Sequence, residues 1–221
     1  MTTPLALTFA WLCVALTALV TVVGRASCVR RWGDLHGHLA YFGLCFLLLG
    51  FVPAVWLWLN DPALLALVGL SIGRIVTGLA LLVLSVPLAA LLLAGMMRDQ
   101  SLGEQYPLSR EAARIPTGFV LYELVYVLGY YSAWEFAFRG ILLFPLAAAL
   151  GLVPALAIQT ALSTLMHIGS PDSEVWGAVA GGVLFGLIAF FTGSILYPFL
   201  IHAGLGVAHD VLRRRHLLRT G

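Results

Sequence analysis

The apolar block TGFVLYELVYVLGYYSAWEFAFRGILLFPLAAA, residues 117–149, decides the fold. As a single helix rising about 1.5 Å per residue it would be roughly 50 Å long, whereas a bilayer core is about 30 Å thick. The block must therefore tilt, project beyond the bilayer or break, and Gly140 and Pro145 are the expected break points. We expect one long, kinked transmembrane element here.

The composition places the whole chain in a membrane. Of its 221 residues 61% are hydrophobic and 10% are charged, and the mean hydropathy is +1.00. Soluble proteins average about 45–50% apolar and about 25% charged residues. A soluble globular enzyme, a disordered chain and a basic nucleic-acid binder are thereby excluded. All twelve cations are arginine, which together with the many Leu and Ala residues points to a GC-rich bacterial genome.

The N-terminal region, residues 1–97, is predicted to contain three membrane helices. Uncharged apolar runs of about 20 residues can span a bilayer, and residues 4–24, 39–59 and 75–97 have this length and character. Residues 62–73 are also apolar but too short to cross, so we expect an interfacial or re-entrant piece there.

The C-terminal region follows a polar, cytoplasmic loop at residues 98–116. It contains four apolar blocks, and we treat residues 117–212 as a single bundle followed by a basic tail at 213–221. The blocks lie at 117–149, 152–167, 175–192 and 195–212. The glycines of the third block form small-xxx-small pairs, which predict close helix packing.

The arginines predict the topology. Seven crossings with the N-terminus outside and the C-terminus inside place ten of the twelve in the cytoplasm, as the positive-inside rule requires. The ten are Arg25, Arg30, Arg31, Arg98, Arg110, Arg114, Arg213, Arg214, Arg215 and Arg219. The expected protein is an all-α, multi-pass helical bundle of the bacterial cytoplasmic (inner) membrane.

Four charged or titratable residues interrupt or close the apolar blocks of the C-terminal bundle: Glu135, Arg139, His167 and His202. Such groups are costly inside a membrane and mark functional sites. Glu135 and Arg139 are four residues apart and share a helix face, so a self-neutralising ion pair is one reading. The alternative is that all four converge on one site, with Glu123 about three turns away.

The residues around these positions resemble the CPBP (CAAX protease and bacteriocin-processing) intramembrane proteases. Trp134–Gly140, sequence WEFAFRG, resembles the EExxxR motif of that family, which is usually followed by glycine. Ser163–His167 stands where the family has FxxxH, and His202–Gly206 where it has HxxxN. The resemblance covers about residues 117–212 and agrees in the order and spacing of the motifs.

This resemblance implies hydrolysis of a peptide bond inside the membrane. In the family a glutamate activates water, while two histidines and a polar residue position the water and stabilise the oxyanion. Carried over, Glu135 would be the base or water-positioning carboxylate and Arg139 would hold it. His167 and His202 would bind water and the oxyanion. The implied partners are the lipid bilayer and a membrane-inserted protein or peptide, for example a C-terminal sorting signal as in the myxosortases; no nucleic acid is expected.

Three positions depart from the family pattern. Trp134 replaces the usual base, Ser163 the phenylalanine, and Gly206 the asparagine. Glu135 is turned about 100° from position 134 around a helix, so it can replace the base only if the helix is rotated or locally unwound.

The departures leave several readings open. The chain is either a divergent protease or a non-catalytic member of the fold, such as a pseudoprotease, an immunity factor or a chaperone. No cofactor is expected, although Glu135, His167 and His202 are chemically able to hold zinc. Ser163 and His167, four residues apart, could also form a serine nucleophile pair, but no third orienting group is evident. A transporter is disfavoured because the halves show no inverted repeat.

Overall fold

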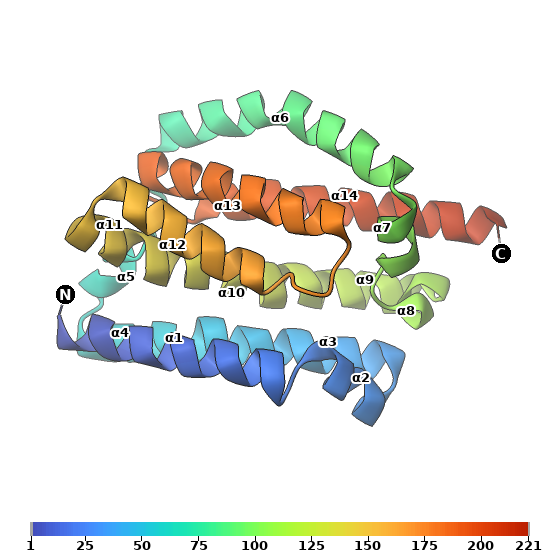
Figure 1. Cartoon of the computed structure of the whole chain (residues 1–221), viewed down its shortest axis with the longest axis horizontal. Coiled ribbons are helices and arrows are strands. Elements are labelled where there is room, and N and C mark those ends of the chain that lie inside the picture. Colours follow the sequence, from blue (N-terminus) through green and yellow to red (C-terminus); the bar gives the residue numbers. More distant parts are fainter. Residues whose placement is uncertain (1, 221) are drawn as a thin grey trace.

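A computed structural model describes residues 2–220, and it confirms the all-α bundle (Figure 1). The described part of the chain contains helices and no strand. The α-helices of the N-terminal region are α1 Thr3–Thr21, α2 Arg25–Trp32, α3 Asp34–Cys45, α4 Val52–Asn60, α5 Ala63–Leu67 and α6 Ile75–Arg98. Those that follow are α7 Gln100–Gln105, α8 Arg110–Arg114, α9 Pro116–Val125, α10 Ser132–Glu135, α11 Phe144–Leu150, α12 Leu152–Leu165, α13 Asp172–Thr192 and α14 Leu196–Thr220. There are also three π-helical segments. η1 Phe46–Phe51 joins α3 to α4, η2 Tyr126–Tyr131 joins α9 to α10, and η3 Phe136–Leu143 joins α10 to α11.

Several of these helices are long and apolar enough to cross a membrane. Five qualify by length and composition: Thr3–Thr21, Asp34–Asn60, Ile75–Arg98, Pro116–Leu150 and Asp172–Thr192. Leu152–Leu165 is apolar but shorter, and α14 carries arginines in its second half. The chain is thus a multi-pass membrane protein, and the figure of seven crossings stays a prediction.

The long block is one helical element, Pro116–Leu150, of 35 residues. It does not end at Gly140 or Pro145. Its irregularity lies in η2 and η3, the two π-helical segments on either side of α10; the expected break point Gly140 falls within η3, whereas Pro145 lies in α11. Wider π turns inside α-helices often occur at functional sites, and here they flank Trp134 and Glu135. Gly140 serves a close approach, because a Cβ there would lie 2.7 Å from the carbonyl oxygen of Val68.

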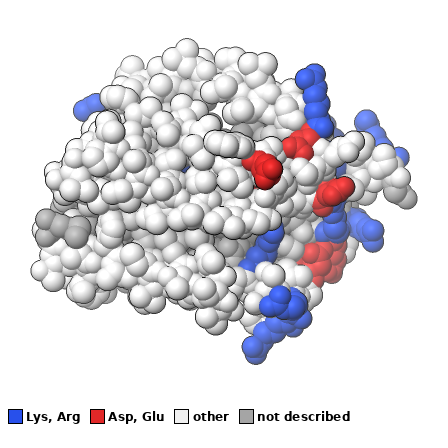
Figure 2. Space-filling model, in the orientation of Figure 1, with Lys and Arg blue, Asp and Glu red and all other residues white. Residues whose placement is uncertain are grey.

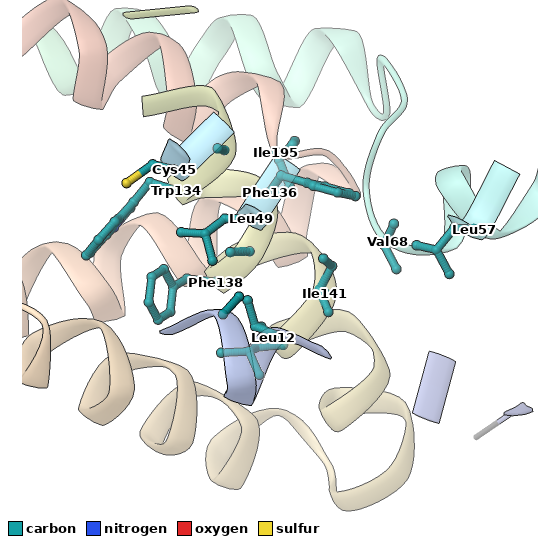
Figure 3. Close-up of a cluster of buried hydrophobic side chains, with 14 of the residues drawn as sticks. Leu12, Cys45, Leu49, Leu57, Val68, Trp134, Phe136, Phe138, Ile141 and Ile195 are labelled. Atoms are coloured by element: carbon teal, nitrogen blue, oxygen red, sulfur yellow. The ribbon is translucent and has the colours of Figure 1, made fainter. Parts of the chain in front are cut away.

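The N-terminal helices support the long element through an apolar core. Figure 3 shows side chains from α1, α3, η1 and α4, among them Leu12, Leu49 and Leu57, gathered with Phe138 and Ile141 of the long element. All five are at most 1% exposed. The N-terminal region therefore forms a packed wall behind the segment that carries Glu135.

The short apolar stretch at 62–73 turns back at one end of the bundle, as an element too short to cross. It consists of α5 and a loop whose Val68 is fully buried. The loop is tied to the turn between α13 and α14, since the Ile195 amide donates to the Gly69 carbonyl at 3.0 Å. The Arg74 amide likewise donates to the Thr192 carbonyl at 2.7 Å.

The opposite end of the bundle collects most of the charge (Figure 2). There lie α2, α7, α8 and the end of α14 (Figure 1). Asp99 begins α7 by accepting hydrogen bonds from the amides of Ser101 and Leu102, and hydrogen bonds from serine hydroxyls and these amides lower the pKa of Asp99 to about 2. Arg213 of α14 donates to the carbonyls of Met96 and Asp99. The C-terminal end of α6 is thereby fastened to α14.

Candidate active site

The four candidate residues come from the long element Pro116–Leu150, from the end of α12 and from α14, which meet inside the bundle. Glu135 ends α10, Arg139 lies in η3, His167 follows α12 and His202 lies in α14. Glu135 is the centre of the group. Its Oε1 is 2.7 Å from Nδ1 of His202, and its Oε2 is 3.2 Å from Nε of Arg139. Three of the four residues are thus in direct contact.

The two contacts of Glu135 differ in kind. The contact with His202 has hydrogen-bond geometry. The contact with Arg139 is close enough for an ion pair, but Glu135 Oε2 and Arg139 Nε both lack a hydrogen-bond partner. Both side chains are almost fully buried, and the Arg139 guanidinium lies 5.6 Å from the centre of the Phe185 ring. We therefore regard His202 as the hydrogen-bond partner of Glu135 and Arg139 as its counter-charge.

A cavity of about 370 Å³ lies beside this group. α6, which arches over α13 and α14 in Figure 1, forms one wall with Ser85, Leu88, Leu92 and Met96. Trp134, Arg139, His167 and His202 also line the cavity, whereas Glu135 does not. Glu135 therefore does not take the cavity-facing position of the missing base, and Trp134 holds that position.

Both histidines line the cavity with their Nδ1 atoms already engaged. His167 Nδ1 is 2.8 Å from the carbonyl oxygen of Ser163, and His202 Nδ1 contacts Glu135. A carbonyl oxygen and a carboxylate only accept hydrogen bonds, so these partners assign the proton to Nδ1 in each ring. In the neutral imidazoles Nε2 is then an acceptor. The site thus offers two basic nitrogens to a molecule in the cavity.

Aromatic rings fix the orientation of both imidazoles. His202 lies edge-on to Tyr131, with ring centres 4.8 Å apart, and Phe185 packs against it at 5.2 Å. His167 lies edge-on to Trp134 at 5.3 Å. Trp134 therefore contributes a rigid wall, but no base, at the position where the resemblance implies the catalytic glutamate.

Two of the open readings find no matching geometry. The Ser163 hydroxyl donates to the Thr160 carbonyl at 3.3 Å, and His167 binds the Ser163 carbonyl instead of its hydroxyl. Among residues 2–220 no group of three or more His, Cys, Asp or Glu side chains is placed to hold a metal ion.

Some residues at the cavity were not singled out from the sequence. Tyr131 and Asp210 line it, and Asp210 accepts a hydrogen bond from Tyr122 at 3.3 Å. Tyr131 stands in an aromatic-rich run that looks like ordinary packing, and Asp210 lies close to the basic tail. Glu123 is not among the lining residues. No sequence signal distinguishes Tyr131 from the other tyrosines of this aromatic run.

The glycines of α13 divide between two neighbours. A Cβ at Gly182 would lie 2.7 Å from Thr160 Cγ2, and one at Gly186 would lie 2.6 Å from Leu156 Cδ2, so these two allow α12 to approach closely. Gly177 and Gly181, together with Gly182, line the cavity. The expected close packing is present, but over only part of the glycine face.

Residues 116–208 match the model of a protein family described as type II CAAX prenyl endopeptidase Rce1-like. This match confirms the resemblance to the CPBP family, and it covers the long element, α12, α13 and the half of α14 that carries His202. The C-terminal bundle therefore has the fold of a CAAX-type intramembrane protease. No curated protein and no solved structure matched the chain.

Proposed function

We propose that this chain is an intramembrane endopeptidase in which His202, oriented by Glu135, activates the attacking water. The observation that carries the proposal is the 2.7 Å contact between Glu135 and a histidine that lines the cavity. A buried carboxylate that orients an imidazole and stabilises its protonated form is the arrangement that makes histidine an effective general base. The reaction class, hydrolysis of a peptide bond, is taken from the protease family that residues 116–208 match.

In the proposed reaction, one water molecule donates its hydrogens to Nε2 of His167 and Nε2 of His202. Its oxygen attacks the carbonyl carbon of the scissile peptide, and His202 takes one proton as the carbonyl oxygen becomes an oxyanion. Glu135 stabilises the imidazolium. The carbon–nitrogen bond then breaks as His202 returns the proton to the leaving nitrogen, giving a carboxylic acid and an amine.

The proposed substrate is a membrane-inserted protein segment, for example a C-terminal sorting signal. Two features support this choice. The cavity lies within the bundle and its α6 wall is largely apolar, and α6 itself is mostly exposed on its outer side, as a lipid-facing helix would be. The arginine distribution supports a bacterial inner-membrane protein with its N-terminus outside and its C-terminus in the cytoplasm.

A non-catalytic role is the second candidate, and Trp134 favours it. The indole occupies the cavity-facing position where the family has its base, and Glu135 reaches the cavity only through His202 and Arg139, which both line it. A pseudoprotease of this kind would hold a transmembrane peptide without cutting it, as an immunity factor or chaperone could.

The catalytic and non-catalytic roles can be distinguished with purified protein in lipid nanodiscs. The protein is mixed with a panel of labelled transmembrane peptides that have basic C-terminal tails. We expect wild-type protein to release a defined fragment, detected by mass spectrometry, and His202→Gln to be slower by about 10²–10⁴-fold, the usual contribution of a general base. Glu104→Gln, at an exposed position in α7, is the matched control. Peptide binding without cleavage by the wild-type protein would establish the non-catalytic role.

A further inference from the structure

The proposed site has two acceptors for water but still needs a donor for the oxyanion. In both histidines the Nδ1 proton is engaged by a protein oxygen, leaving Nε2 as a base. Hydrogen-bond donors aimed at the developing oxyanion usually make a large contribution to acyl-transfer catalysis. A donor should therefore exist on the cavity wall near His202.

Tyr131 presents such a donor. It lies at the end of η2, one turn before Glu135, and its ring packs edge-on against His202. The side chain is 6% exposed and lines the cavity. A phenol hydroxyl donates a hydrogen bond while remaining neutral in a membrane interior.

The position of the hydroxyl explains the glycine at 206. A Cβ built on Gly206 would collide with the Tyr131 hydroxyl oxygen and would lie 2.7 Å from Cζ of the same ring. Gly206 also lines the cavity. It follows His202 by one helical turn on α14. The phenol thus fills the space in which a side chain at position 206 would stand.

We propose that the Tyr131 hydroxyl is the oxyanion donor of this site, taking the place of a polar side chain at position 206. The inference rests on the proposed function. In the reaction the hydroxyl keeps its proton and shortens its hydrogen bond as negative charge develops on the carbonyl oxygen. Tyr131 is then a catalytic residue, and Gly206 is the residue that makes room for it.

The first test removes only the hydroxyl. Tyr131→Phe keeps the ring against His202, so we expect unchanged abundance, unchanged thermal midpoint and unchanged KM, with kcat lower by about 10²–10³-fold, as for loss of one oxyanion donor. Tyr41→Phe is the matched control, because Tyr41 belongs to the same aromatic cluster but does not line the cavity. Wild-type kcat in Tyr131→Phe overturns the inference and would point to Arg139 as the donor.

The second test moves the donor to the other helix. Tyr131→Ala vacates the space beside Gly206 and should lose activity. Adding Gly206→Asn places an amide donor in that space, and we expect part of the lost kcat to return. Adding Gly206→Ala refills only volume and should restore nothing. Equal rescue by alanine and asparagine would assign Tyr131 a packing role and overturn the inference.

The inference about Tyr131 can fail while the proposed function holds, and the experiments distinguish the two cases. If wild-type protein cleaves and His202→Gln does not, while Tyr131→Phe cleaves normally, only the Tyr131 inference is lost. If the wild-type protein binds peptides and cleaves none, the proposed function and this inference are lost together.

Discussion

Glu135 lies behind His202: its Oε1 is 2.7 Å from Nδ1 of the imidazole, while the carboxylate itself is fully buried and lines no part of the cavity. Glu135 therefore cannot contact water or substrate in the cavity directly. Arg139 is its counter-charge, and the contribution of Glu135 to catalysis that we propose passes through the orientation and charge of His202. This relationship makes the two residues one functional unit.

Residues that act as a unit have non-additive effects. We expect Glu135→Gln to reduce kcat/KM strongly with the protein folded, since the amide keeps the shape of the carboxylate and loses its charge. Combining it with His202→Gln should cost little more than His202→Gln alone. The measurement is kcat/KM for both single variants and the double variant in nanodiscs. Fully multiplicative losses would show that Glu135 acts independently of His202.

Some residues of this site can be predicted from the sequence and others cannot, for physical reasons. Charged groups in a membrane are costly, so Glu135, Arg139, His167 and His202 could be selected without a structure. The facing of residues 134 and 135 could not, because η2 and η3 change the helical register on either side of α10. The contact between Tyr131 and Gly206 joins two helices 75 positions apart in sequence, and no local pattern encodes it.

The ion pair between Glu135 and Arg139 predicts an effect on stability that is separate from catalysis. Arg139→Met leaves a buried carboxylate without its counter-charge, and breaking such a pair usually costs about 3–5 kcal/mol. We expect lower abundance and a lower thermal midpoint. The double variant Glu135→Gln/Arg139→Met removes both charges and should recover the midpoint. If the double variant is no more stable than Arg139→Met, the guanidinium stabilises the fold through other contacts.

If the reaction uses no metal ion, as we propose, it should be insensitive to chelators. Prolonged dialysis against a strong chelator should leave peptide cleavage unchanged, and adding zinc afterwards should have no effect. Loss of activity that zinc restores would instead support the zinc reading, with Glu135, His167 and His202 as ligands.

The two faces of α13 predict opposite responses to added methyl groups. Gly182→Ala places a Cβ 2.7 Å from Thr160 Cγ2, at a close approach of α12. Overpacking of this kind usually costs about 1–3 kcal/mol, so the thermal midpoint should fall. Gly177→Ala is the matched control for stability, because nothing lies within 4 Å of its Cβ, and its midpoint should be unchanged or slightly higher. A fall of equal size in both variants would show a general intolerance of α13 to side chains.

The separation of charge predicts the orientation of the chain in the membrane. Arg74 directly precedes α6, whose first turn lies at the end of the bundle away from α2, α8 and the end of α14, where the other loop and tail arginines gather (Figure 1). The positive-inside rule then places Arg74 outside and Arg215 in the cytoplasm. In a cysteine-free background that lacks Cys13, Cys28 and Cys45, we expect Arg74→Cys to react with an impermeant maleimide in intact cells. Arg215→Cys should react only after permeabilisation. Because both replaced residues are arginines, each variant loses one charge, and Arg219→Cys should repeat the result for the tail. Labelling of Arg215→Cys in intact cells would show the opposite topology, with the charged end of the bundle outside the cell.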